Sequence, residues 1–198
     1  NIFAPEEWMD AHPDEIVDYA DPESWKDGGW GGPRQASWTS EPWRKDACEA
    51  LRRLIRHART SPYARNIIGW HIGSGVYGEW HYPNPMGYPD TSKAFVKRYR
   101  QWLSKRYPSN TPPPRLPAIQ ERRNARHGLF HDPVRDKWMM DHAEFLHLQG
   151  AEVLLAFAAI AKEESGRKSL VVVFNGYMPD LGINHEADHS GLPLVLGS

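Results

Sequence analysis

The chain is poor in the features that mark several classes of protein. It has 198 residues and one cysteine, Cys48, which excludes an internal disulfide. Its formal net charge of -1 argues against nucleic acid as a partner. No apolar run reaches the roughly 18 residues of a membrane span, so no membrane partner is expected. The chain does not begin with methionine. We therefore expect its natural N-terminus to be missing, and the compartment and oligomeric state stay open.

Aromatic residues, by contrast, are abundant. Nine Trp, eight Tyr and six Phe make up 12% of the chain. Several tryptophans lie in segments rich in glycine and proline, such as residues 19–39, where they cannot all belong to a helix core. Long loops of this kind are usually functional or disordered, and the tryptophans favour function. The length predicts one domain, residues 1–198.

Three helices are predicted from apolar spacing and capping signals. Ser40 is a candidate N-cap with Pro42 in the first turn. A second helix follows Thr91 or Ser92, and the longest begins at 132–133, runs to about 164 and is closed by Gly166. The first helix carries its apolar residues at three- and four-residue spacing: Trp43, Ala47, Leu51, Leu54, Ile55 and Ala58.

Strands are predicted between these helices. The stretch "NIIGWHI", residues 66–72, is a continuous apolar run of the type buried on both faces of a parallel sheet. A second clean strand is "SLVVVFNGY", residues 169–177. Residues 1–3 resemble the end of a strand, and "LPLVLG", residues 192–197, the start of another. Strands that alternate with helices predict an α/β fold with a parallel sheet.

In such folds the functional site lies at the C-terminal ends of the strands. Carboxylates among aromatic rings suit a carbohydrate site, since rings stack on the apolar faces of sugars while acids and amides bind hydroxyls. An apolar surround also raises the pKa of a carboxyl group, so Glu79 is the candidate general acid/base. The structural alternative is that Glu79 caps a helix or pairs with an arginine. The other candidates in these loops are Glu6, Trp8, His71, Tyr77, Trp80, Asn175 and Tyr177.

Three stretches carry a resemblance to a known family: "PEEWMDAHPDE", "ASWTSEPWRKDACEALRRLIRHARTSPYARNIIGWHIGSGVYGEW" and "TSKAFVKRYRQWLSKRYPS". In this order they resemble the catalytic barrel of bacterial glycoside hydrolases similar to the family-42 β-galactosidases. The resemblance implies a (β/α)8 barrel with "NIIGWHI" as its fourth strand and the acid/base at that strand's end. Because such barrels need about 250 residues, the expected fold is a partial TIM (β/α)8 barrel, roughly strands 3 to 6 with their helices.

The sequence departs from the family pattern at the catalytic position. Family-42 enzymes carry Asn-Glu directly after this strand, where this chain has Ser74 and Gly75, and the nearest acid is Glu79. The family's nucleophile, a Glu at the end of the seventh strand, would lie beyond Ser198. Retaining glycosidases need two carboxyl groups about 5–5.5 Å apart and no cofactor. We therefore expect the chain alone to be inactive. The sugar subsite would be lined by His71, Tyr77, Trp80, Asn175 and Tyr177, with Glu6 and Trp8 as weaker candidates.

Two other functions stay open. The missing Asn-Glu pair favours a barrel that binds carbohydrate without cleaving it. A remoter alternative is a metal-dependent hydrolase, because His185, Glu186 and His189 have H-E-x-x-H spacing. That motif needs a helix, and Gly182 before it and "SGLP" after it leave room for barely two turns, so no metal is expected. The basic run 121–128 lacks interleaved aromatics and is predicted to be a solvated segment.

Overall fold

The computed structural model describes residues 4–25, 34–74, 78, 80–82, 84, 87–107, 115–124 and 132–174. The described helices and strands, in chain order, are α1 (Glu6–Ala11), η1 (Pro13–Glu15), η2 (Pro22–Trp25), α2 (Glu41–Thr60), η3 (Ala64–Asn66), β1 (Gly69–Ile72), α3 (Lys93–Arg106), α4 (Ile119–Asn124), α5 (Lys137–Glu164) and β2 (Leu170–Val173).

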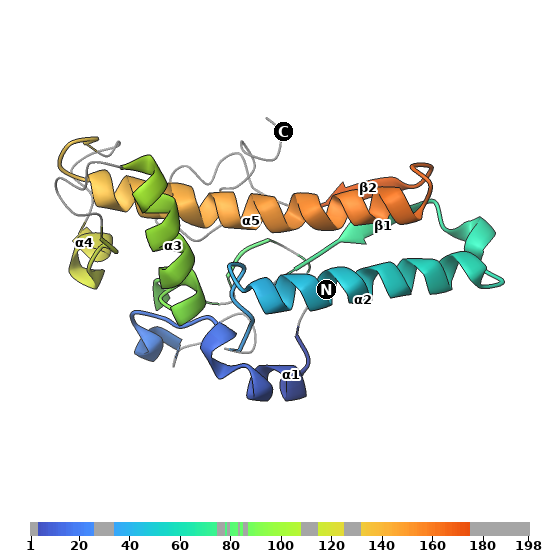
Figure 1. Ribbon diagram of the computed structural model, residues 1–198, viewed down its shortest axis with the longest axis horizontal. Coiled ribbons are helices and arrows are strands. Elements are labelled where there is room, and N and C mark those ends of the chain that lie inside the picture. The colour runs from blue at the N-terminus through green and yellow to red at the C-terminus, as the bar shows by residue number, and fades with distance from the viewer. Residues whose placement is uncertain are drawn as a thin grey trace.

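Three long helices frame the structure. Helices α2 and α5 lie side by side and run in the same direction, and α3 crosses the N-terminal half of α5 (Figure 1). The crossing is packed by aromatic rings, with the Phe95 ring centroid 5.2 Å from that of Phe145. By length and composition alone α5 could cross a membrane, but 44% of its most apolar window is buried inside the protein. A core helix passes the same test, and α5 contacts α2 and both strands.

Helix α2 forms for the reasons that the sequence indicates. The Ser40 hydroxyl accepts the backbone N–H of Trp43 at 3.1 Å, which satisfies one of the free N–H groups at the helix start. Its buried residues recur every four positions, at Trp43, Ala47, Leu51 and Ile55. Leu54, which was expected on this face, is 56% exposed because it lies beside the buried stripe.

The other two predicted helices agree with expectation except at the start of α5. Of the two candidate caps for α3, Ser92 caps it, because its hydroxyl accepts the Phe95 N–H at 3.2 Å. Helix α5 begins at Lys137, after the predicted start, since the Asp132 carboxylate accepts two backbone N–H groups and holds 133–135 in a turn. It ends at Glu164, followed by Gly166 at a φ of +61°. The left-handed conformation there explains the glycine.

Strands β1 and β2 pair in parallel, as the sequence predicted. Gly69 lies opposite Leu170 and Ile72 opposite Val173. A Cβ atom at Gly69 would lie 2.9 Å from the carbonyl oxygen of Leu170, so glycine permits this close approach. Strand β1 is shorter than the predicted 66–72 because residues 64–66 form a 3₁₀ helix. The strands expected at 1–3 and 192–197 lie outside the described residues.

One face of this two-stranded sheet packs on the core and the other does not. Trp70, Ile72, Val171 and Val173 point to the core. In the described part of the chain, the opposite face exposes His71, 60% of Leu170 and 55% of Val172. The expectation that the strand 66–72 is buried on both faces is therefore wrong for the described residues.

The basic run 121–128 was predicted to be solvated, but one of its described residues is buried. Arg122 is only 6% exposed. Its guanidinium donates to the carbonyl oxygen of Tyr88 at 2.7 Å and to that of Pro89. A buried guanidinium needs such acceptors. Arg122 therefore links α4 to the segment that precedes α3.

Candidate functional site

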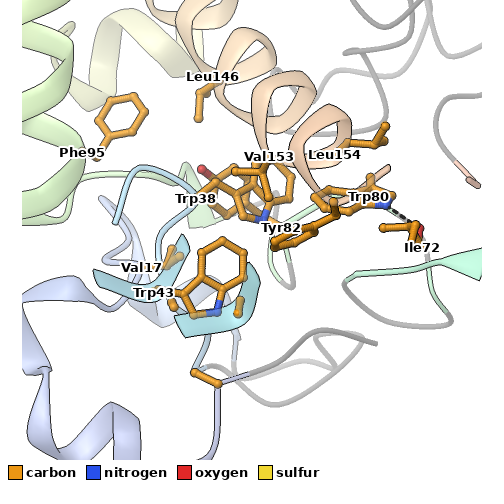
Figure 2. Close-up of a cluster of buried hydrophobic side chains, with 14 of the residues drawn as sticks. Val17, Trp38, Trp43, Ile72, Trp80, Tyr82, Phe95, Leu146, Val153 and Leu154 are labelled. Atoms are coloured by element: carbon orange, nitrogen blue, oxygen red, sulfur yellow. Dashed lines mark hydrogen bonds between the residues drawn. The ribbon is translucent and has the colours of Figure 1, made fainter. Parts of the chain in front are cut away.

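The segment after β1 is bound to the C-terminal ends of both strands through Trp80. The Trp80 backbone N–H donates to the carbonyl oxygen of Phe174, which directly follows β2, at 3.3 Å. The indole Nε1–H donates to the carbonyl oxygen of Ile72, the last residue of β1, at 2.9 Å (Figure 2). One residue therefore joins the two strand ends, at the edge of the sheet where the site was predicted.

The Trp80 ring itself is part of the core. It is 4% exposed, and its centroid lies 5.9 Å from that of Trp38 and 6.2 Å from that of Phe157 on α5. Tyr82, which is fully buried, extends the cluster with its ring 4.3 Å from Trp38 (Figure 2). A ring with 4% exposure has almost no surface on which a ligand could stack. The burial of Trp80 therefore favours an interior role over the predicted stacking on a sugar.

Four predicted site residues lie outside the described residues: Tyr77, Glu79, Asn175 and Tyr177. In the sequence, Glu79 directly precedes Trp80, and Asn175 directly follows Phe174. Trp80 and Phe174, which are hydrogen-bonded to each other, are thus the chain neighbours of Glu79 and Asn175. The H-E-x-x-H stretch also lies outside the described residues. Within them, no cluster of three His, Cys, Asp or Glu side chains could hold a metal ion.

His71 is exposed, as a binding residue must be. It lies on the open face of the sheet, opposite Val172, one residue before the end of β1. Because side chains alternate along a strand, His71 points away from the core on which Ile72 packs. The structure thus brings His71 and Trp80 to the same strand end, on opposite sides of the sheet.

Glu6 and Trp8 have partners elsewhere. The Glu6 side chain is 68% exposed, and its carboxylate forms an ion pair with the Arg34 guanidinium at an N–O distance of 2.7 Å. The Trp8 indole donates to Asp46 on α2 at 2.9 Å, and its ring stacks on His12 at 4.1 Å. The described partners of these two residues lie just after α1, in the segment before α2 and on α2, and not at the strand ends.

Sequence reasoning missed a buried carboxyl group, Asp90. It is fully buried, and its two oxygens accept the Ser37 hydroxyl at 2.5 Å and the Ser92 backbone N–H at 2.8 Å. Burial raises the pKa of Asp90 to about 6, against the lowering effect of these hydrogen bonds. Burial, and then the Asp90 charge, also raise the pKa values of Tyr19 and Tyr82. The available sequence signal for Asp90 was its position directly before Thr91 and Ser92, the two candidate caps of α3.

A pocket of about 200 Å³ lies at the opposite end of the strands. The pocket lies where α2 and α5 end, and helix C-termini attract cations. Arg59 donates to the carbonyl oxygen of Glu164, and Lys162 donates to that of Ser169 at 2.9 Å. These cations satisfy backbone carbonyl groups, so the pocket has a structural explanation. Its lining residues are Arg59, Ala64, Ile67, Trp70, Ser165, Lys168 and Ser169.

Comparison with family models and with curated proteins finds no match. Among solved structures, the chain is similar to the crystal structure of a β-galactosidase from Bacillus circulans sp. alkalophilus, with a TM-score of 0.53 and 15% sequence identity. The similarity covers 93% of this chain and 28% of the β-galactosidase chain, so this chain spans less than a third of that enzyme's length. The chain therefore shares its fold with part of that β-galactosidase.

Proposed function

We propose that this chain is part of a glycoside hydrolase-like (β/α)8 barrel that cleaves glycosidic bonds with two carboxyl groups. The observation that carries the proposal is the fold shared with a β-galactosidase over 93% of the chain. The parallel pairing of β1 and β2 supports it, because helices α3, α4 and α5 lie between the two strands in the chain, as a helical crossover between parallel strands requires. The predicted resemblance to family-42 enzymes is consistent with the same fold.

Glu79 is the proposed general acid/base. Its chain neighbour Trp80 is bonded to the C-terminal ends of β1 and β2, which is where barrel enzymes carry their catalytic groups. His71, Tyr77, Asn175 and Tyr177 remain the proposed sugar contacts. Trp80 takes the role of an anchor, since its ring is buried. The second carboxylate, the nucleophile, is proposed to lie outside this chain, and the reaction requires no cofactor.

The test uses the complete gene product and a panel of β-glycosides. If Glu79 is the general acid, Glu79→Gln lowers kcat about 10²- to 10⁴-fold on alkyl glycosides, whose leaving groups need a proton. The loss is smaller on nitrophenyl glycosides, because nitrophenolate leaves without protonation. Glu7→Gln, at an exposed carboxylate of α1, is the control and keeps full activity.

Two results would contradict the proposal. Full activity of the Glu79→Gln variant on alkyl glycosides would remove Glu79 from the mechanism. Binding of oligosaccharides by the wild-type protein, with no turnover of any glycoside, would instead favour the carbohydrate-binding barrel.

A further inference from the structure

We propose that Trp80 is a positioning residue: it ties residue 80 to the ends of both strands and so limits where its chain neighbour, position 79, can lie. The anchoring itself rests on the geometry of Trp80. Its consequence for catalysis rests on the proposed function, in which residue 79 supplies the acid/base.

Trp80 makes two hydrogen bonds, one from its backbone and one from its side chain. Any residue except proline could donate the backbone N–H that binds the Phe174 carbonyl oxygen. The second bond needs a side chain with a donor, and the indole Nε1–H of Trp80 donates to the Ile72 carbonyl oxygen at 2.9 Å. Together the two bonds fix both the position and the rotation of residue 80 relative to β1 and β2.

Packing removes the remaining freedom of the ring. Trp38 and Phe157 lie against it from the segment before α2 and from α5, and Trp80 is 4% exposed. Consecutive Cα atoms are about 3.8 Å apart, so a fixed residue 80 restricts where the backbone of residue 79 starts. Catalytic groups must be held within about 0.5 Å of their productive position. An error of about 1 Å can cost about 10²-fold in rate.

The chain offers a matched control in Trp38. This tryptophan is 5% exposed, packs in the same cluster and is in ring contact with Trp80 (Figure 2). Its Nε1 atom is buried and has no hydrogen-bond partner among the described residues. Replacing either tryptophan with phenylalanine removes the same part of a buried indole. Only Trp80→Phe removes a hydrogen bond to a strand end.

The experiment compares Trp80→Phe and Trp38→Phe in the complete gene product by amide hydrogen exchange and by steady-state kinetics. We expect the peptide covering residues 78–82 to exchange about five- to tenfold faster in Trp80→Phe than in Trp38→Phe, because one buried hydrogen bond is lost. We also expect Trp80→Phe to lower kcat with little change in KM, which a general loss of stability would not produce. We expect Trp38→Phe, which loses ring contact with Trp80 but no hydrogen bond, to lower kcat less than Trp80→Phe does.

The outcomes separate the anchor from the proposed function. Equal exchange of residues 78–82 in the two variants would overturn the anchor. Faster exchange with an unchanged kcat would overturn the positioning role. If the wild-type protein turns over no glycoside, the proposed function fails, while the exchange comparison still decides whether Trp80 holds the loop.

Discussion

The buried carboxyl group of Asp90 predicts a pH dependence of stability that one substitution isolates. Asp90 is fully buried, and burial raises its pKa from 3.8 to about 6 in the folded protein. The folded state therefore binds the Asp90 proton more tightly than the unfolded state does. By linkage, the free energy of unfolding is highest below pH 3.8, falls as pH rises from 3.8 to about 6, and is level above that range.

The size of this effect follows from the shift of the Asp90 pKa. A difference of one pKa unit corresponds to about 1.4 kcal/mol, so ionising Asp90 in the folded state costs about 3 kcal/mol in full. Most of this cost, about 2 kcal/mol, arises between about pH 4.5 and about pH 7.5. Tyr19 and Tyr82, which face Asp90, have pKa values raised above their usual range and do not titrate there.

The assay is urea unfolding of the wild type and of Asp90→Asn at about pH 4.5 and at about pH 7.5. Asparagine keeps the shape, and the Ser37 hydroxyl can turn to accept from its amide, because Ser37 also has Thr39 within 2.6 Å. The variant should gain about 2 kcal/mol relative to wild type on going from the lower to the higher pH. Glu7→Gln, at an exposed carboxylate of α1, is the control. An equal stability difference at both pH values would refute the buried, proton-binding Asp90.

Two further substitutions test the local structure by urea unfolding. Ser40→Ala removes the hydroxyl that accepts the Trp43 N–H and should lower the free energy of unfolding by about 1 kcal/mol; an unchanged midpoint would show that Ser40 does not cap α2. Gly69→Ala places a Cβ atom 2.9 Å from the Leu170 carbonyl oxygen and should cost about 1–3 kcal/mol. Wild-type stability of that variant would show that β1 and β2 separate easily at this point.

The helices were predictable because their signals are local. The cap at Ser40 and the four-residue spacing from Trp43 to Ile55 lie within one stretch of chain, and the structure uses both. The start of α5 was misplaced because Asp132 resembles a cap, while its carboxylate in fact holds a separate turn. Helix ends depend on which of several competing hydrogen bonds is made, and spacing alone does not decide this.

The roles of individual aromatic residues were less predictable. Trp80 lies in a loop rich in glycine and proline, so its sequence context favoured a surface platform. The structure buries it, because Trp38 from a different loop and Phe157 from α5 close around its ring. Partners so distant in the chain leave no local pattern. The sequence placed Asp90 beside a helix cap, but its burial depends on distant partners such as Ser37, which no local pattern reveals.

The sequence by itself determined the three long helices and the two strands that pair in parallel, since these depend on the local spacing of apolar residues and on capping residues. Only the tertiary structure decided which side chains are buried and what they bind. It placed Trp80 across the ends of β1 and β2 and enclosed Asp90 with Ser37 and Ser92. Such contacts form when segments far apart in the chain pack together, and packing is a property of the whole fold.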